Sequence, residues 1–346
     1  MKKNILVLFC WGTISMTKNL ETWSLDVANG ADQLFKIEPR IVELANIDVH
    51  FVVNIDSTNA TPKLWEDIGD IIQEKYDQYD GFLITTGTNT MAYMASALSF
   101  SLTNLGKPVI ITGAQIPAEI ISTDGRNNLV NALRIATMDL GGVFVVFGSK
   151  LILWCRSKKL SESELDAFGS FNAKEFGEIG IGVRINYETH KLHDEKLMLK
   201  NGFDDNIMSI TLFPGISNEY LLKMIDMGVR WFVLRGYGTG DVSEYIFPFL
   251  KKAQENEVPV VVTTQCRGST VMWIDSVWLE ALKFGVIESY DMSIESMTTK
   301  LMRCIKQWIP YKDMKHIMQQ NLHGEINTTQ VKFFRSKELQ ESIENI

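Results

Sequence analysis

The chain contains little cysteine and no long hydrophobic run. Its four cysteines, Cys10, Cys155, Cys266 and Cys304, are scattered over 346 residues without a CxxC pair. This spacing predicts neither a disulfide framework nor a zinc site, and it favours a reducing compartment, the cytoplasm. No segment reaches the roughly 18 consecutive apolar residues that a membrane-spanning helix needs, so we expect no membrane association.

The first residues, MKKNILVLFCWG, combine two lysines with an apolar run, as secretion signals do. The run, 5–10, is shorter than the apolar core of a normal signal peptide, and no small-residue cleavage site follows it. We therefore interpret it as the first buried strand of the fold. Residues 15–33 are polar and lack periodicity, so we expect a mobile loop there, above the first turn.

Positive charge is also in deficit. The 34 Lys and Arg residues face 42 Asp and Glu residues, which gives a net charge of −8. Proteins that bind nucleic acid without sequence preference concentrate basic residues on one face, and this sequence shows no such concentration. We therefore expect no nucleic-acid partner.

Short apolar runs alternate with helical patterns along the whole chain. The expected strands cover residues 5–9, 49–53, 81–84, 108–112, 143–147, 151–153, 207–212, 231–235 and 258–263. Helical patterns begin at Pro62, at Met91 and after Arg126, and others cover 245–256 and 291–308. This alternation predicts an α/β fold with a mostly parallel sheet flanked by helices.

The length of 346 residues suggests two domains, at about 150 residues each. We expect a larger N-terminal α/β domain at 1–186, a linker at 187–206 and a smaller C-terminal α/β domain at 207–346. The linker segment is polar and contains His190 and His193, three positions apart. Such a pair can bind a metal on a helix, but we interpret both histidines as solvated linker residues and predict no metal site.

Hydroxyl side chains follow several of the expected strands. The clearest case is residues 85–90, Thr-Thr-Gly-Thr-Asn-Thr, which lie between the strand 81–84 and a helix. Thr13, Ser57 and, more weakly, Thr112 hold equivalent positions after other strands. Helix capping explains one such hydroxyl, whereas four at the carboxyl edge of a parallel sheet indicate a ligand site.

Longer motifs around these turns point to a family. They are DSTNATPKLWEDI, YDGFLITTGTNTMAYMASALSF, GKPVIITGAQIPAEIISTDGRNNLVNAL, KKLSESELDAFGSFN, VLRGYGTG and TTQC. In order and spacing the chain resembles the bacterial L-asparaginases, especially the cytoplasmic type I enzymes, from the first strand through the last helix. The resemblance implies the asparaginase fold and amide hydrolysis without a metal or cofactor. It also implies a homodimer or homotetramer in which the small domain completes the neighbour's site.

The resemblance assigns roles to particular residues. Thr13 corresponds to the family's nucleophile, and Thr88 with Lys159 corresponds to a second threonine that works with a lysine. The positions implied for the substrate pocket are Asp56, Ser57, Gly87, Asn89, Ala114, Asp241 and Trp23, of which the serine holds the α-carboxylate. Arg235 and Cys266 correspond to positions that line the effector site of type I enzymes.

These residue types suit amide hydrolysis. A threonine hydroxyl is a weak nucleophile until a base takes its proton. A lysine can act as that base only when its pKa is lowered. Backbone N–H groups at a strand–helix turn can stabilise the oxyanion that forms in the tetrahedral intermediate.

The chain departs from the family pattern at several positions. Asn89 stands where the family has an aspartate that binds the substrate's α-ammonium, and Trp11 replaces the first glycine of the family's GGT turn. The loop 17–30 contains no tyrosine, and Trp23 is its nearest aromatic residue. Asp241, in turn, stands where type I enzymes have an asparagine, so positions 89 and 241 together would keep one carboxylate near the ammonium.

Three functions are consistent with this pattern. The first is an amidohydrolase that acts on L-asparagine or a close relative. The second is an enzyme of the same fold for a modified or peptide-embedded asparagine or aspartate, because a substrate without a free ammonium would not need the missing carboxylate. The third is a noncatalytic homologue that binds a small amino acid or a protein partner, against which the retention of Thr13, Thr88 and Lys159 counts.

Overall fold

The protein divides into two compact units, Met1–Phe203 and Asp204–Ile346, which we describe separately. The computed structural model describes residues 2–10, 12, 16–18, 25–27, 35, 37–118, 120–186, 195–270 and 276–327. Among these residues, no helix combines the length and the apolar character that crossing a lipid bilayer requires.

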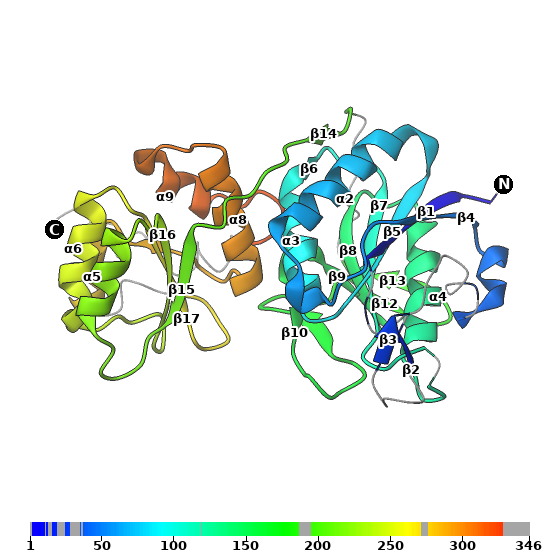
Figure 1. Cartoon of the computed structure of the whole chain (residues 1–346), viewed down its shortest axis with the longest axis horizontal. Helices are drawn as coiled ribbons and strands as arrows, with labels where there is room; N and C mark the ends of the chain where they lie inside the picture. The colour runs from blue at the N-terminus through cyan, green and yellow to red at the C-terminus, as the bar shows by residue number, and fades with distance from the viewer. Residues whose placement is uncertain are drawn as a thin grey trace. The chain divides into compact units, whose positions relative to one another are not determined.

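The first unit contains an eight-stranded sheet in the order β13-β12-β9-β8-β7-β5-β1-β4 (Figure 1). The strands are β1 (Asn4–Cys10), β4 (Asn46–Phe51), β5 (Gly81–Thr86), β7 (Pro108–Thr112), β8 (Gly142–Phe147), β9 (Lys150–Leu153), β12 (Gly177–Ile179) and β13 (Val183–Ile185). Strands β4, β1, β5, β7 and β8 are parallel, and β9, β12 and β13 extend the sheet in antiparallel pairings. Every residue of β5, β7 and β8 is buried, which is typical of parallel strands covered on both faces.

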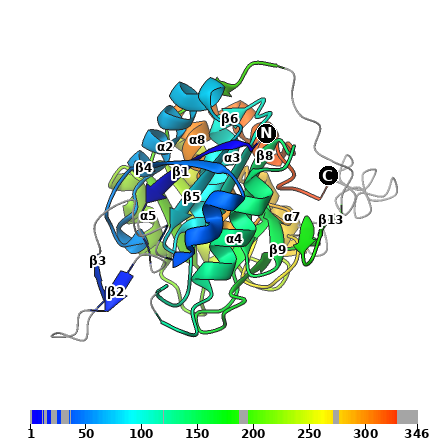
Figure 2. The same cartoon turned by 90° about the vertical axis from the view of Figure 1, so that its right-hand side faces the viewer.

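Three helices in the described part of this unit cover the sheet. They are α2 (Pro62–Lys75), α3 (Met91–Ser101) and α4 (Gly125–Ala136). Helix α2 has a proline in its first turn and buries Trp65, Ile68 and Ile72 on one side. Helix α3 buries every residue except Tyr93 and packs against α2, β7 and β8, while α4 packs against β5, β7 and β8 (Figure 2). The expected fold class, a mostly parallel sheet with helices, is confirmed.

Most expected strands agree closely with the structure, and 108–112 agrees at both ends. The expected strand 49–53 is shifted, because β4 covers Asn46–Phe51 and ends two residues earlier. Its position is set by pairing from Asn4↔Asn46 to Phe9↔Phe51 at the sheet edge, where no continuous apolar run marks the strand. The expectation of a loop without strands at 15–33 was wrong, because β2 (Met16–Lys18) and β3 (Leu25–Val27) pair in antiparallel fashion. The other residues of this segment lie outside the described residues.

The segment expected to link the domains is anchored in part to the first unit. Strand β14 (Met198–Leu199) pairs with β6 (Leu102–Thr103). The Asn201 side-chain amide donates to the Glu66 carbonyl at 2.8 Å, and the Phe203 N–H donates to the Glu66 carboxylate at 3.0 Å. Residues 187–194, which include His190 and His193, lie outside the described residues.

The second unit is built on a four-stranded parallel sheet, β15 (Ile207–Thr211), β16 (Trp231–Gly236), β17 (Val260–Thr264) and β18 (Ile287–Glu288). Its helices are α5 (Asn218–Asp226), α6 (Phe247–Glu255), α7 (Ser276–Lys283), α8 (Ile294–Lys306) and α9 (Tyr311–Gln319). Alternate residues of β16 enter two apolar clusters. Phe232 and Leu234 pack with α5 and α6, whereas Trp231 and Val233 pack with α8 and α9.

Two helices of this unit begin later than expected. Helix 245–256 starts as a 3-10 turn, Glu244–Ile246, and becomes α-helical at Phe247, next to a proline in the first turn. Helix 291–308 starts at Ile294, because the Ser293 hydroxyl caps it by accepting the Ser296 N–H at 3.1 Å.

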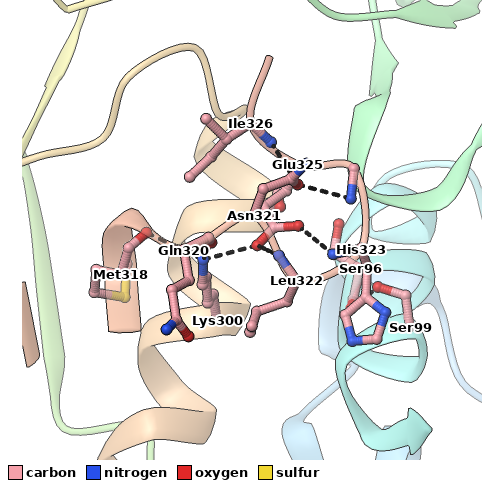
Figure 3. Close-up of polar contacts among 12 residues, drawn as sticks. Ser96, Ser99, Lys300, Met318, Gln320, Asn321, Leu322, His323, Glu325 and Ile326 are labelled. Carbon is pink, nitrogen blue, oxygen red and sulfur yellow. Dashed lines mark hydrogen bonds and ion pairs between the residues drawn. The ribbon is translucent and has the colours of Figure 1, made fainter. Parts of the chain in front are cut away.

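A buried ion pair joins α8 to the turn that follows α9 (Figure 3). The Lys300 ammonium donates to Glu325 Oε1 at 2.7 Å and to the carbonyls of Met318 and Gln320 at 3.0 and 2.5 Å. The Glu325 carboxylate also accepts the His323 N–H at 2.7 Å. Both side chains are at most 1% exposed. Burial alone would raise the pKa of Glu325, but the Lys300 charge and these N–H donors lower it.

Candidate active site

Glycines bring the turns at the carboxyl edge of the first sheet into contact. Gly12, which follows β1 and has φ of +150°, lies where a Cβ would be 2.5 Å from the Gly87 nitrogen. A Cβ on Gly87 would meet the Ser57 hydroxyl, and one on Gly113 would meet the Thr86 carbonyl. Any larger residue would therefore force the turns after β1, β4, β5 and β7 apart.

The central contact of the site is between Thr88 and Lys159. The Lys159 ammonium donates to Thr88 Oγ1 at 2.8 Å and to Asn89 Oδ1 at 3.1 Å. Thr88 is 7% exposed, and its hydroxyl donates to Gln115 Oε1 at 3.1 Å. The threonine oxygen therefore accepts from the lysine while its proton points to the glutamine. This arrangement can pass a proton between a hydroxyl and an amine.

A short hairpin positions the lysine. Lys159 is the last residue of β10 (Ser157–Lys159), and it pairs with Phe168 of β11 (Phe168–Ser170). The entry to β10 is fixed because the Ser157 hydroxyl donates to the Trp154 carbonyl at 2.8 Å. A side chain at the end of a paired strand has less freedom than one on an open loop, so the ammonium is held near Thr88.

The electrostatic environment favours the neutral form of Lys159. Partial burial lowers the pKa of its ammonium, and the charge of Glu162 opposes that shift. Among the described residues no carboxylate forms an ion pair with Lys159, since its acceptors are a hydroxyl and an amide. A lysine in this setting is closer to acting as a base at neutral pH than an ordinary surface lysine.

The turn after β4 contributes Asp56 and Ser57. Asp56 Oδ1 accepts from the N–H and the hydroxyl of Thr58, both at 2.7 Å, and these bonds lower the pKa of Asp56. Asp56 Oδ2 has no partner within the described part of the chain. Ser57 is buried, and its carbonyl accepts from the Thr90 hydroxyl at 2.9 Å. The turns after β4 and β5 are thereby joined directly.

Sequence reasoning missed a polar network behind Thr88. The Gln115 amide donates to the carbonyls of Glu162 and Glu164 at 3.0 and 3.3 Å. The Gln115 backbone N–H donates to the buried Asp124 carboxylate at 3.0 Å, and Asn128 donates to it at 2.9 Å. The aspartate lies just before the first turn of α4, a helix-start position that the sequence STDGRNN could have indicated.

Other expected residues lie near this edge in different roles. Ala114 is fully buried after β7. The expectation for Thr112 was wrong, because its hydroxyl donates to the Val146 carbonyl on the neighbouring strand at 2.8 Å and does not enter a turn. Thr13, Trp11 and Trp23 lie outside the described residues.

The remaining expected residues share the carboxyl edge of the second unit's sheet. Arg235 lies on β16 opposite Thr263 of β17, and the exposed Cys266 follows β17 by two residues. Asp241 closes a tight turn after β16, with its N–H donating to the Tyr237 carbonyl at 2.7 Å. Within the described ranges, His, Cys, Asp and Glu side chains form no group of three that could hold a metal.

Two family models match most of the chain. The model "Asparaginase, N-terminal" matches residues 4–191, and "Glutaminase/Asparaginase C-terminal domain" matches residues 206–318. The chain belongs to the asparaginase family. The expected resemblance is therefore confirmed.

Individual relatives of this asparaginase-family protein agree over nearly its whole length. L-asparaginase 1 of Escherichia coli (strain K12) is 34% identical over 333 residues, which cover 94% of this chain and 98% of that protein. L-asparaginase I from Vibrio cholerae O1 biovar eltor str. N16961 has a TM-score of 0.86 at 35% identity and covers 94% and 100% of the two chains. The thermostable L-asparaginase from Thermococcus kodakarensis has a TM-score of 0.88 at 32% identity and covers 94% and 99%.

Proposed function

We propose that this asparaginase-family protein hydrolyses the side-chain amide of L-asparagine or a close relative. The observation that carries the proposal is the bond of 2.8 Å between the Lys159 ammonium and Thr88 Oγ1, with no carboxylate pairing the lysine among the described residues. The three relatives described above are named asparaginases, and each matches the chain almost from end to end.

In the proposed reaction, the Thr13 hydroxyl attacks the amide carbon of the substrate. Its proton passes to the base formed by Thr88 and neutral Lys159, and backbone N–H groups of the turn stabilise the oxyanion. Collapse of the intermediate breaks the C–N bond, and the amide nitrogen leaves as ammonia with a proton from the same pair. Water then attacks the acyl-enzyme and releases the carboxylate product. An equivalent route has Thr88, activated by Lys159, attack directly or activate water.

Ammonia release across four substrates tests this function. L-asparagine should be hydrolysed faster than L-glutamine, N-acetyl-L-asparagine and an asparagine-containing peptide. The Lys158→Met variant serves as the matched control, because Lys158 lies over the Phe171 ring, 5.1 Å from its centre, and neighbours Lys159 in the chain. No ammonia from any of the four substrates would overturn the proposal.

A second function is favoured by Asn89. Its amide oxygen accepts from Lys159, at a position where the family pattern has a carboxylate for the substrate's ammonium. A substrate whose amine is blocked would not need that carboxylate. Faster hydrolysis of N-acetyl-L-asparagine or of the peptide than of free asparagine would assign this function instead.

We further infer that the protein assembles as a homodimer or homotetramer in the cytoplasm, with Asp241 of one subunit completing the site of another. A compensating pair of substitutions tests this assembly. Asp241→Asn should weaken binding of a free amino acid by about 3 kcal/mol, and adding Asn89→Asp should recover most of that loss. Additive effects of the two substitutions, or a monomer by light scattering, would contradict it.

A further inference from the structure

The second unit contains a cavity of about 560 Å³ that no step of the proposed reaction uses. It is lined by residues that include Arg230 and Trp231 before and in β16, Val258 and Pro259 before β17, and the segment from Trp308 to Tyr311. Arg230, Trp231, Val258 and Pro259 precede or begin the strands, whereas Trp308–Tyr311 connects α8 to α9. The cavity therefore lies at the amino ends of β16 and β17, the edge opposite Arg235 and Cys266.

Three helices, α5, α6 and α8, end at this cavity in the same way. The residue after each C-cap has a positive φ, namely Gly228 (+91°), Glu257 (+53°) and Trp308 (+55°). The next N–H bonds back to the helix, from Val229 to Met224, Val258 to Ala253 and Ile309 to Cys304, at 3.1, 2.8 and 3.2 Å. This is the Schellman ending, in which glycine is the usual residue at the left-handed position. The three helix carboxyl ends also place partial negative charge around the cavity.

Trp308 is the unexpected residue at these positions. A left-handed backbone costs a residue with a side chain about 1 kcal/mol or more relative to glycine. Packing could offset that cost, but the indole is 78% exposed and contacts the Arg230 guanidinium, which lies 5.7 Å from the ring centre. Packing of the indole therefore offsets little of this backbone cost, and residues held in such conformations cluster at ligand-binding sites.

Three of the polar side chains that line the cavity are Arg230, which also contacts the Trp308 ring, Glu257 and Tyr311. Among the residues that the structure describes, the Arg230 guanidinium, the Glu257 carboxylate and the Tyr311 hydroxyl have no hydrogen-bond or ion-pair partner. Desolvation and the Glu257 charge both raise the pKa of Tyr311, so the tyrosine keeps its proton and lies within the field of the carboxylate. One cavity therefore offers a cation, an anion, a neutral hydroxyl and an aromatic face.

We propose that this cavity binds a small zwitterion, a free amino acid or short peptide, with its carboxylate on Arg230, its ammonium on Glu257 and its apolar side chain against Trp308. A guanidinium binds a carboxylate through two parallel N–H bonds. The ammonium is favoured on the Glu257 side, where the helix carboxyl ends add negative potential. A volume of about 560 Å³ is within the ordinary range for small-ligand sites.

Calorimetric titration of the full-length protein with L-phenylalanine tests the proposal. Arg230→Gln, Glu257→Gln and Trp308→Gly should each weaken binding by about tenfold or more. Trp308→Gly introduces the residue that the left-handed position prefers, so this variant should fold at least as well as the parent. Lys251→Gln is the control, because this exposed lysine of α6 does not line the cavity.

Modified probes assign the two charged contacts. N-acetyl-L-phenylalanine lacks the ammonium, so its binding should no longer respond to Glu257→Gln. L-phenylalanine amide lacks the carboxylate and should no longer respond to Arg230→Gln. The dipeptide L-phenylalanyl-L-phenylalanine is compared with L-phenylalanine to show whether the cavity prefers a peptide or a free amino acid. The preferred ligand binds more tightly, and its binding depends on both Arg230 and Glu257. Two results would overturn the proposal: no binding of any probe at millimolar concentration, or binding that survives the three variants and disappears in Ser57→Ala.

Discussion

Lys159 and Lys300 show two opposite ways of placing a lysine inside this protein. Lys300 is almost fully enclosed and pairs with the Glu325 carboxylate at 2.7 Å. Lys159 is only partly buried, and its acceptors are the neutral oxygens of Thr88 and Asn89. A carboxylate stabilises the charged form of an amine, whereas burial without one favours the neutral form. This difference supports the chemical role that we propose for Lys159, whereas the contacts of Lys300 are those of a structural ion pair.

The largest expected effect is on activity. Thr88→Val and Lys159→Met should each lower kcat for ammonia release by about 10²–10⁴-fold, because each removes one end of the proton path. The double variant should be no slower than the slower single variant, since both residues act in one unit. Steady-state kinetics on the preferred amide substrate measures this, with Lys158→Met as the control. Losses that multiply in the double variant would contradict a shared role.

The next effect is on stability and concerns the other lysine. Lys300→Met should reduce the free energy of unfolding by about 3–5 kcal/mol, because it leaves the Glu325 carboxylate buried without its cation. Urea denaturation followed by circular dichroism measures the change. Lys159→Met should change it by less than about 1 kcal/mol. Removing both charges with Lys300→Met and Glu325→Leu should restore much of the loss, and an equal loss in the double variant would argue against the ion pair as its cause.

A smaller effect follows from giving Lys159 the carboxylate that Lys300 already has. Asn89→Asp should raise the pKa of Lys159, because a nearby negative charge favours the ammonium. Activity that needs neutral lysine should then appear at higher pH, as a pH profile of kcat would show. Asn89→Ser, which is neutral, is the control. An unchanged profile in the aspartate variant would mean that Lys159 is not the titrating base.

The smallest effects are on the pH dependence of stability, and the two regions should differ in the pH range where they act. The folded-state pKa of Glu325 is lowered, so its contribution is present above the unfolded value of about 4.3 and is lost as pH falls through the folded pKa. The folded-state pKa of Lys159 is also lowered, so the unfolded chain binds more protons and stability rises with pH up to about 10.4. The free energy of unfolding should be measured across pH for the Glu325→Gln and Lys159→Met variants. In each variant it should depend less steeply on pH than in the parent protein, within the range given for that residue.

The sequence pattern predicted the main strands of the sheet but not all of the polar contacts behind Thr88. Strands such as 108–112 are continuous apolar runs between turn residues, so pattern alone located them. The bonds from Gln115 to Glu162 and Glu164 span 47 and 49 residues, and no local pattern reports a contact at such a separation. Short strands such as β12 and β13 carry only three residues each and lack an apolar signature.

The contacts of Lys159 and Lys300 also could not be predicted from the local sequence. Lys159 was located only because the motif around it resembles a family motif. Lys300 lies in an amphipathic helix between Thr299 and Leu301, where a lysine ordinarily faces solvent, and nothing nearby in the sequence marks Glu325 as its partner. Burial of a charge depends on what the fold brings from elsewhere, so the sequence predicted the helix but not the ion pair.

The close contacts that Gly12, Gly87 and Gly113 make with neighbouring segments limit how this site can be redesigned. The space that each glycine leaves is filled by a neighbouring segment of the protein, so the four turns pack closely against one another. A loop taken from another enzyme would keep its fit only if its neighbours were transplanted with it. A change of specificity at this site therefore requires the turns after β1, β4, β5 and β7 to be exchanged together. A single foreign turn would clash with its neighbours or leave gaps beside them.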